Sequence, residues 1–357
     1  MNRPLLHIVR RYGPVGGMER YVWELTGQLA AMGHQVDVLC ERIHADSTPN
    51  GVRCTELGEA TPKPRWLAQL RFSRRVSLWI ANNQDQRHII HSHERTAVHH
   101  VTTFHGPPFA TVRERSWNRR ASLRAQANLW LERREVCGAQ VHAIVPNANT
   151  IGAMLNRFYP CIGNRLTKPV TPGVSPGPAR PERIAPANGG VIGFIGKEWK
   201  RKGLEIAISI IGALRRTRPN LELWVAGPAP SEVEGLFAGW QGGYRLLGEV
   251  DSRDFYPEFD LLIHPARAEP YGMVIAEAMA ARVPVLVSAQ CGAACEVSQR
   301  HGDVLEIDTP VKAWAKAANA LLARKASPPG FERPWSQVAQ DYTALYERTF
   351  LDQANSS

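Results

Sequence analysis

The sequence predicts an α/β protein with two doubly wound parallel-sheet domains whose loops face a shared cleft. Three observations support this fold class: short apolar segments alternate with helical stretches, a proline- and glycine-rich stretch divides the chain, and the charge balance changes there. With 357 residues, 44% of them apolar, the chain can bury two cores. Repeated strand and helix units of this length favour parallel sheets covered on both faces.

The expected strands are short apolar segments, and the segment from Met18 to Met32 has helical periodicity. In the first half of the chain the strands are LLHIV (residues 5–9), HQVDVLC (34–40), HIIHSH (88–93) and HAIVP (142–146). In the second half they are GVIGFIG (190–196), ELWVAG (222–227), YRLLG (244–248), DLLIHP (260–265) and VPVLVS (283–288).

The stretch TPGVSPGPARPERIAPANGG, residues 171–190, separates the two halves. It holds five prolines and four glycines, which interrupt helices and central strands, so we interpret it as a linker. The net charge of +10 also divides here: residues 1–173 carry 23 Lys and Arg against 12 Asp and Glu, or +11, and the remainder carries 20 against 21, or −1. We expect domains at 1–173 and 174–334, followed by a terminal segment, 335–357.

The terminal segment begins with WSQVAQDYTALYERTF, in which apolar residues recur at helical spacing. One helix face would carry Trp335, Val338, Ala339, Tyr342, Leu345 and Tyr346. This helix could pack on the second domain, which precedes it in the chain. The preferred interpretation is that it crosses back onto the first domain.

The composition gives no sign of a membrane span or a secreted chain. Uninterrupted apolar runs are only a few residues long, so neither a transmembrane helix nor a cleavable signal is expected. The six cysteines lack paired short spacings except for Cys291 and Cys295, which favours reduced thiols in a cytoplasmic protein. A zinc ion at that pair would need further ligands with matching spacing, and the sequence offers none.

Five histidines lie close together in the sequence: His91, His93, His99, His100 and His105. They could bind a metal, but the alternation of the first two at a strand end fits the wall of a cleft equally well. We expect no metal and no cofactor. His105 is expected in the cleft, with a capped turn before Gly106 as the alternative.

Two loops that follow predicted strands could bind an anion. Gly16 and Gly17 come where backbone N–H groups and the positive end of a helix dipole can meet a phosphate. The pattern is not the GxGxxG fingerprint, and such a pair also makes tight turns. In the second domain, Lys197 and Lys202 could point into the cleft toward a diphosphate. Their neighbours Lys200 and Arg201 are expected to be solvated.

The stretch EPYGMVIAEAMAARVPV places two carboxylates on either side of a turn. Glu269 lies on a loop after a predicted strand, and Glu277 lies in the second turn of the next helix, about 7 to 10 Å away. Between them, the backbone N–H groups of Gly272, Met273 and Val274 are free to meet an anion. This spacing suits a ligand with hydroxyl groups at both ends and phosphate in the middle, which describes a nucleotide sugar.

An ordered set of motifs now resembles a known family over nearly the whole chain. The motifs are GPVGGMER, MGHQVDV, TFHG, TPGV, FIGKEWKRKG, LWVAGPAP, LLGEV, HPARAEPYGMVIAEAMAARVPVL and CGAACEV. They look like those of the retaining glycosyltransferases of family 4, of the kind that build bacterial lipopolysaccharide and surface polysaccharides. The resemblance implies the GT-B fold, in which the final helix returns to the first domain.

The resemblance also implies roles for single residues. Glu269 is similar to the family glutamate that contacts the donor sugar, and Glu277 to the one that holds the ribose. Backbone groups of residues 272–274 and of residues 16 and 17 would contact phosphate, and His105 would lie near the donor sugar. Val250 corresponds to the position where the base meets the main chain. Lys197 replaces the usual arginine, so this position offers a compact ammonium charge where a guanidinium could form two parallel hydrogen bonds.

What the resemblance implies chemically is a retaining, metal-independent hexosyltransferase. Cations and helix dipoles would stabilise the departing diphosphate, and the acceptor hydroxyl would attack the same face of the sugar. A UDP-hexose or UDP-N-acetylhexosamine is the expected donor. The alternatives are a transferase with a soluble acceptor, a nucleotide-sugar 2-epimerase of the same fold, and a non-catalytic membrane-surface subunit.

The surplus positive charge indicates where the acceptor could bind. Residues 112–134 carry seven arginines with two tryptophans among them, and the candidate surface residues are Arg113, Arg115, Trp117, Arg119, Arg120 and Arg124. A second patch, RWLAQLRFSRR, lies at residues 65–75. An ordinary solvated helix face is one interpretation. The preferred one is an anionic inner membrane leaflet that presents a glycolipid, with no role for nucleic acid.

Overall fold

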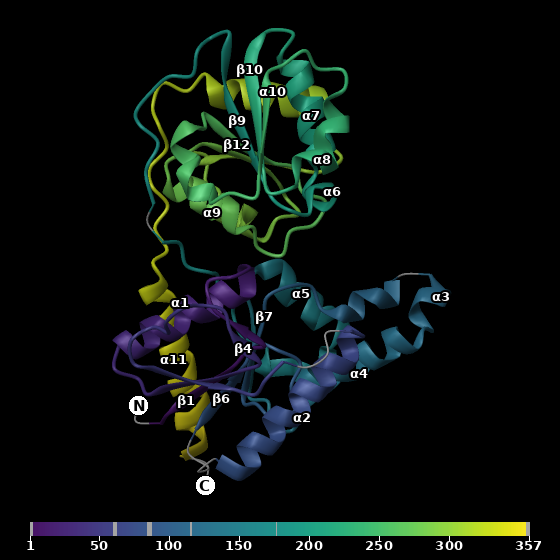
Figure 1. The fold of residues 1–357 in the computed structure, drawn as a ribbon, viewed down its shortest axis with the longest axis vertical. Helices are drawn as coiled ribbons and strands as arrows, with labels where there is room; N and C mark the ends of the chain where they lie inside the picture. The colour runs from purple at the N-terminus through teal and green to yellow at the C-terminus, as the bar shows by residue number, and fades with distance from the viewer. Residues whose placement is uncertain (1–2, 60–62, 84–87, 115, 176, 355–357) are drawn as a thin grey trace. The chain divides into compact units, whose positions relative to one another are not determined.

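The computed structural model describes residues 3–59, 63–83, 88–114, 116–175 and 177–354, without side-chain detail for residues 118, 119, 252 and 351–354. The chain divides into two compact units (Figure 1). Unit 1 contains residues 1–173 and 333–357, and unit 2 contains residues 174–332.

The sheet of unit 1 is parallel throughout and has the strand order β5-β3-β1-β6-β7-β8. Its strands are β1 (Leu5–Ile8), β3 (Val36–Cys40), β5 (Val52–Glu56), β6 (Ile89–Ser92), β7 (Val101–Phe104) and β8 (Ala143–Pro146). The short strands β2 (Arg11–Tyr12) and β4 (Arg42–Ile43) pair separately. The chain order 3-2-1-4-5-6 across the sheet is that of a Rossmann fold.

The helices of unit 1 cover this sheet, and they include the terminal helix of the chain. They are α1 (Gly17–Ala31), α2 (Arg65–Asn83), α3 (Trp117–Arg120), α4 (Leu123–Cys137), α5 (Asn149–Phe158) and α11 (Trp335–Ala354), with 3₁₀ turns at Phe109–Glu114 and Pro160–Arg165. Helix α11 packs against α1, where the Tyr21 hydroxyl lies 3.0 Å from that of Tyr342 (Figure 1). The terminal helix therefore belongs to unit 1, and the alternative of packing on the second domain is wrong.

The sheet of unit 2 repeats the same order, β11-β10-β9-β12-β13-β14, and is also parallel. Its strands are β9 (Gly189–Ile195), β10 (Asn220–Ala226), β11 (Tyr244–Gly248), β12 (Leu261–His264), β13 (Val285–Ser288) and β14 (Gly302–Leu305). The helices are α6 (Trp199–Lys202), α7 (Leu204–Leu214), α8 (Pro230–Val233), α9 (Met273–Ala280) and α10 (Val311–Leu322), with 3₁₀ turns at Glu234–Phe237, Ser252–Asp254, Tyr256–Glu258 and Gly292–Glu296. Apolar residues of α7 and α10 pack with strand residues in the core around Trp314.

The fold class predicted from the sequence is confirmed, because both units contain Rossmann-like parallel sheets. Strands β5, β7 and β14 were not predicted, since their sequences mix polar and apolar residues. The scattered cysteines include one close pair: the Sγ atoms of Cys137 and Cys161 lie 3.2 Å apart. Among the helices within the described ranges, none has the length and apolar character needed to cross a bilayer.

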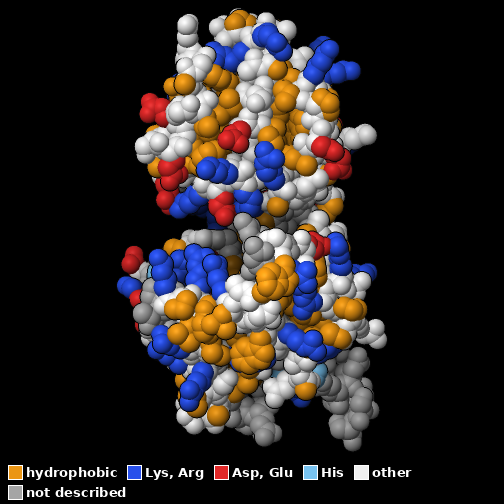
Figure 2. Space-filling model, turned by 90° about the vertical axis from the view of Figure 1, so that its right-hand side faces the viewer, with side chains coloured by type: hydrophobic (Ala, Val, Ile, Leu, Met, Phe, Trp, Pro, Cys, Tyr) orange, Lys and Arg blue, Asp and Glu red, His pale blue; other side chains and the backbone are white. Residues whose placement is uncertain are grey.

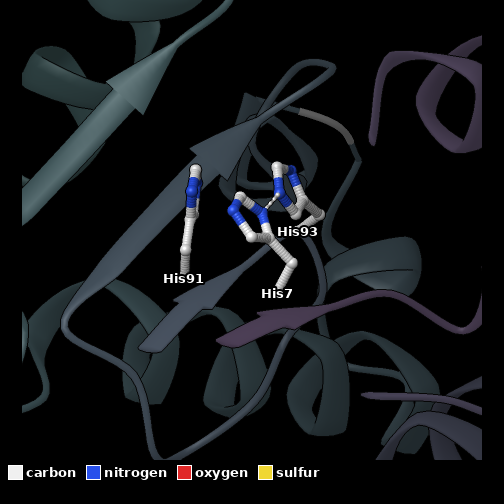
Figure 3. A group of neighbouring side chains, drawn as sticks. All are labelled: His7, His91 and His93. Atoms are coloured by element: carbon white, nitrogen blue, oxygen red, sulfur yellow. Dashed lines mark hydrogen bonds between the residues drawn. The ribbon is translucent and has the colours of Figure 1, made fainter. Parts of the chain in front are cut away.

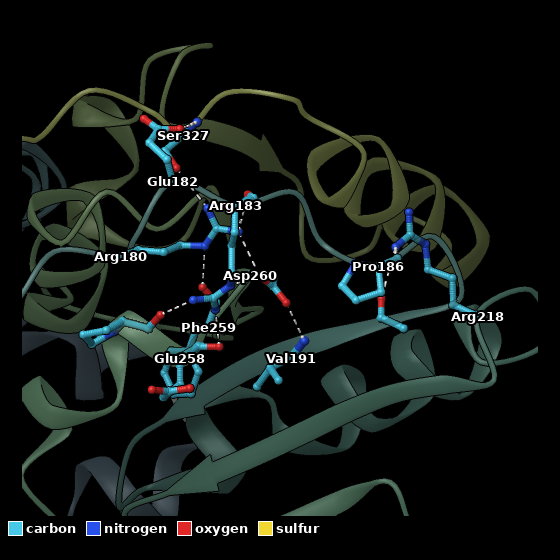
Figure 4. Close-up of polar contacts among 12 residues, drawn as sticks. Arg180, Glu182, Arg183, Pro186, Val191, Arg218, Glu258, Phe259, Asp260 and Ser327 are labelled. Atoms are coloured by element: carbon cyan, nitrogen blue, oxygen red, sulfur yellow. Dashed lines mark hydrogen bonds and ion pairs between the residues drawn. The ribbon is translucent and has the colours of Figure 1, made fainter.

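The proline-rich stretch is not a free linker along its whole length. Arg180 donates to Asp260 Oδ1 at 2.8 Å and to the Phe259 carbonyl at 2.9 Å, and Arg183 donates to the same carboxylate oxygen at 2.9 Å (Figure 4). The other oxygen of Asp260 accepts from the backbone N–H of Val191 at 2.9 Å. Two cations and one strand N–H therefore converge on a buried carboxylate, and this fixes the start of unit 2.

Asp260→Asn is expected to destabilise unit 2 by about 3 to 5 kcal/mol, because it leaves the buried Arg180 guanidinium without a counter-ion. Denaturant unfolding followed by hydrogen exchange in unit 2 peptides measures this. The matched control Asp251→Asn breaks an exposed pair with Arg253 and should cost less than about 1 kcal/mol. Equal effects of the two substitutions would contradict the assigned role.

Candidate active site

The candidate site of unit 2 lies where the strand order reverses. β9 and β12 are neighbours in the sheet, and the chain leaves them in opposite directions across it. Ligands of doubly wound folds bind beyond the carboxyl ends of the strands at such a point. The segments that follow these two strands are residues 196–203 and 265–272, and they carry Lys197, Lys202, Glu269 and Gly272 of the predicted donor site.

Glu269 is the centre of this site. Its Oε2 lies 3.2 Å from Lys202 Nζ, 3.4 Å from the guanidinium of Arg201 and 3.4 Å from His264 Nε2. The Glu269 side chain is only 9% exposed, whereas the Lys202 side chain is 15% exposed. The expectation that Arg201 is solvated is therefore wrong: it faces Glu269 and also donates to the carbonyl of Ala268.

The electrostatics of this cluster keep Glu269 ionised. Burial alone would raise the pKa of Glu269, but the hydrogen bond from His264 and the charges of Lys202 and Arg201 together lower the pKa to about 2. Burial lowers the pKa of His264, so its ring is neutral at pH 7 and donates through Nε2. The result is a fixed carboxylate held by one neutral and two cationic donors.

Two glycines allow Lys202 to reach Glu269. Gly203 has φ of 81°, and a Cβ there would lie 2.0 Å from the carbonyl oxygen of Pro265. A Cβ at Gly196 would lie 2.1 Å from Cδ of Lys202. A side chain at Gly196 would therefore displace the lysine, and a side chain at Gly203 would clash with the backbone of Pro265.

The start of α9 is held close to Glu269. Gly272 is the N-cap residue with φ of 100°, and a Cβ there would lie 3.2 Å from Cγ of Glu269. The first N–H groups of the helix, which include those of Met273 and Val274, have no intrahelical acceptor. They are available to an anion beside Glu269, and the helix dipole favours negative charge there.

The remaining predicted residues of unit 2 lie further from this cluster. Glu277, on the second turn of α9, accepts a hydrogen bond from the Tyr256 hydroxyl at 2.8 Å. Lys197 pairs with Glu249, and both side chains are mostly exposed. Val250 is exposed after β11. The structure does not bring Lys197 to Glu269, and its contact with phosphate stays a prediction.

In unit 1, the predicted glycines begin α1. Gly16 is the N-cap residue with φ of 74°, and a Cβ there would lie 2.5 Å from a carboxylate oxygen of Glu19. A Cβ at Gly17 would meet nothing within 4 Å. Glu19 is buried beside this loop and pairs with Arg11. Phosphate binding by the two glycines stays a prediction.

His105 follows β7 and is half-buried. Its Nε2 lies 2.9 Å from His93 Nδ1, and its ring meets that of Tyr21 edge-on at 4.8 Å. Burial lowers the pKa of His105 to about 3, so the ring is neutral. The candidate catalytic histidine is thus joined to a buried neighbour.

Two of the five predicted histidines, His93 and His105, are hydrogen-bonded to each other, and His93 is also bonded to His7. Nitrogen atoms of His7, His91 and His93 lie within 4.8 Å of one another (Figure 3). However, His91 already bonds the Tyr346 hydroxyl at 2.6 Å and Thr103 at 2.8 Å, while both nitrogens of His93 face other imidazoles. Ligation of a metal would compete with these bonds, and the expectation of no metal stays a prediction.

The basic segment of residues 112–134 forms a surface with exposed aromatic groups. Trp117 is 76% exposed, and Trp130 and Leu123 are also exposed. On the face drawn in Figure 2, hydrophobic and basic side chains lie together over the unit that carries α3 and α4. Arg113, Arg120 and Arg124 are exposed, whereas Arg115 and the side chain of Arg119 lie outside the described residues. In the second patch, Phe72 is buried and belongs to the core.

Three neighbours of the site were missed in the sequence analysis: His264, Tyr256 and His7. His264 and His7 lie in strands whose other residues are buried and apolar, and a polar residue in such a strand was the available signal. Tyr256 belongs to an irregular segment and gave no signal.

Comparison with known proteins agrees with these observations. Residues 15–176 match the model for Glycosyltransferase Family 4, and residues 189–324 match that for Glycosyl transferases group 1. The two matches together span most of both units. The chain belongs to the family 4 glycosyltransferases with the GT-B fold.

Individual relatives are distant. The chain is 26% identical to the D-inositol 3-phosphate glycosyltransferase of Jonesia denitrificans, over 94% of this chain and 92% of the relative. It is 28% identical to the lipopolysaccharide glucosyltransferase WaaG of Escherichia coli, over 42% of this chain and 40% of WaaG. A crystal structure of WaaG matches with a TM-score of 0.74 at 19% identity over 97% of each chain. Anabaena HepE with UDP and glucose matches with a TM-score of 0.65 at 15% identity, over 97% of this chain and 100% of HepE.

The low pKa of Glu269 predicts a pH-dependent contribution to stability. The folded-state pKa is about 2 and the ordinary value is 4.5, so the contribution is present above about pH 4.5 and is lost as the pH falls toward 2. Relative to Glu269→Gln, the wild-type chain should gain about 3 kcal/mol from this ionisation at pH 7 and about half of that or less at pH 3.

Denaturant unfolding of unit 2 at a series of pH values measures this difference. The exposed Glu234→Gln is the matched control, because its side chain lies outside this cluster. A difference between Glu269→Gln and wild type that is constant from pH 7 to pH 3 would contradict the ion cluster.

Proposed function

We propose that this protein is a retaining, metal-independent hexosyltransferase that uses a UDP-hexose or UDP-N-acetylhexosamine. One observation carries the proposal: ionised Glu269, Lys202 and the start of α9 lie together beyond the paired ends of β9 and β12. This combination offers an acceptor for sugar hydroxyls beside donors for phosphate. The UDP complex of the structurally similar HepE supports the choice of nucleotide.

The charges suit departure of a nucleoside diphosphate. Breakage of the bond between the anomeric carbon and phosphate places negative charge on the leaving group and positive charge on the sugar. Lys202 and the N–H groups at the start of α9 would stabilise the leaving charge, and Glu269 would hold the sugar. These protein cations can perform the task of a metal, so we propose that none is required.

Retention would follow from attack on the face that the diphosphate leaves. The departing phosphate oxygen would take the proton of the acceptor hydroxyl. Glu269 is not proposed as a nucleophile, because His264, Lys202 and Arg201 already engage its Oε2. Its role is to orient hydroxyl groups of the donor.

Substitutions should separate donor binding from turnover. Lys202→Ala is expected to weaken UDP binding by about 1.5 to 3 kcal/mol, the range for hydrogen bonds to charged groups. Glu269→Gln should cut release of the nucleoside diphosphate from a panel of UDP- and GDP-sugars while UDP affinity changes only a few fold. Calorimetry measures UDP affinity, and a nucleotide-release assay measures turnover. The anomeric configuration of the product shows whether transfer occurs with retention.

Lys200→Ala is the matched control, because Lys200 is exposed and lies over the ring of Trp199 instead of near Glu269. It should bind UDP as the wild type does. Equal UDP affinity in Lys202→Ala and wild type would overturn the donor site. Release of UDP with inversion at C2 of the sugar would indicate an epimerase. A glycoside with inverted configuration at the anomeric carbon would indicate an inverting transferase.

For the acceptor we propose a glycolipid, such as a lipopolysaccharide core, presented at an anionic inner leaflet where the protein is peripheral. Arg113, Arg120 and Arg133 line one hollow beside Trp130, with a volume of about 400 Å³. Exposed indole and guanidinium groups together suit a headgroup region. The similarity to WaaG supports this acceptor class.

Liposome co-sedimentation tests the membrane surface. Substitution of Arg120, Arg124 and Arg133 by serine should weaken binding to anionic vesicles by roughly 1 kcal/mol per charge, and high salt should weaken binding of the wild type. The control replaces exposed Arg216, Arg300 and Lys312 of unit 2, which removes the same charge elsewhere. Equal losses in both triple variants, or equal binding to neutral vesicles, would contradict the proposal.

A further inference from the structure

Three imidazole rings form a continuous chain in unit 1. His7 lies on β1, His93 directly follows β6, and His105 directly follows β7. His93 Nε2 lies 3.2 Å from His7 Nδ1, and His93 Nδ1 lies 2.9 Å from His105 Nε2 (Figure 3 for the first pair). His93 therefore connects a fully buried ring at one end with the half-buried candidate catalytic ring at the other.

All three rings are neutral, so each carries one N–H. Burial lowers the pKa values of His7 and His105 to about 3 and that of His93 well below its ordinary value. A neutral imidazole donates from one nitrogen and accepts at the other. Since both nitrogens of His93 face other imidazoles, the three rings must all be protonated at Nε2 or all at Nδ1.

The other polar groups around the three rings already have hydrogen-bond partners. The choice between the two arrangements therefore depends on the surroundings of His7 and His105. The neighbouring ring of His91 is already engaged by Tyr346 and Thr103. The Tyr21 hydroxyl, whose ring meets His105, bonds Tyr342 and the Val170 carbonyl. Neither His91 nor the Tyr21 hydroxyl therefore bonds a ring nitrogen of His7, His93 or His105.

The buried end of the chain favours one of the two arrangements. His7 Nε2 is buried and has no hydrogen-bond partner among the described residues. In the Nε2–H arrangement, His7 would bury an N–H without an acceptor, and orphaned buried N–H groups are rare in proteins. In the Nδ1–H arrangement, His7 donates to His93 and His93 donates to His105, so that only a bare ring nitrogen is left unpaired at the buried end.

We propose that His93, backed by His7, is a positioning residue that holds His105 as its Nδ1–H tautomer. Nδ1 of His105 has no hydrogen-bond partner among the described residues, and the ring is half-buried. His105 thus presents an N–H to substrate and donates to an oxygen of the donor's sugar or phosphate. It does not take a proton from the acceptor hydroxyl. This role rests on the proposed function, whereas the tautomer itself does not.

Long-range ¹H–¹⁵N correlation spectra of protein labelled at histidine distinguish protonated from bare ring nitrogens. Single substitutions of the three histidines assign the signals. The expected result is protonated Nδ1 and bare Nε2 in His7, His93 and His105 without any ligand. A mixed set of tautomers would overturn the coupling, and Nε2–H in all three rings would overturn the donor role of His105.

A pair of variants tests the positioning role in turnover. His93→Asn places an amide donor near the position of Nδ1, whereas His93→Leu removes it. The leucine variant should lose about tenfold in kcat with little change in KM or UDP affinity, and asparagine should restore most of that loss. Equal losses of kcat in the two variants would mean that His93 acts only through packing. If neither variant folds, the spectra still decide the tautomer of His105, whose signals the substitution of His105 itself assigns.

Discussion

The ionised carboxylate of Glu269, buried beside Lys202, Arg201 and His264, is the interaction on which the candidate site depends. Several cations of one short loop could not converge without it, because like charges repel strongly away from water. Its neighbours are in turn fixed by backbone geometry at Gly203 and by the packing of the loop before α9. The local fold of unit 2 and its proposed chemistry therefore rest on one electrostatic arrangement.

The corresponding position of unit 1 is built from a different kind of polar group. Both sheets have the same strand order, so β1 and β6 end at the strand-order reversal of unit 1 as β9 and β12 do in unit 2. There the buried groups are neutral imidazoles joined by hydrogen bonds, and Tyr342 and Tyr346 of α11 complete the network. The terminal helix thus supports the interior of unit 1 beside His105.

Sequence patterns predicted the alternation of strands and helices, and the apolar face around Tyr342 indicated a packed terminal helix. The motif around Glu269 also placed a carboxylate and a helix start together. What the sequence could not show was which side chains converge from distant segments. His264 and His7 looked like core residues within apolar strands, and Arg201 looked like part of a solvated basic loop. The clamp between Arg180 and Asp260 joins residues 80 apart, which no local pattern reveals.

A crystal structure with UDP-glucose tests the central claim most directly. The account predicts the diphosphate at the first N–H groups of α9 and beside Lys202, with the sugar hydroxyls on Glu269. The carboxylate should exchange part of its contact with the cations for contact with the sugar. Nucleotide bound elsewhere in the chain, with the Glu269–Lys202 pair intact and untouched, would contradict the assignment of this site.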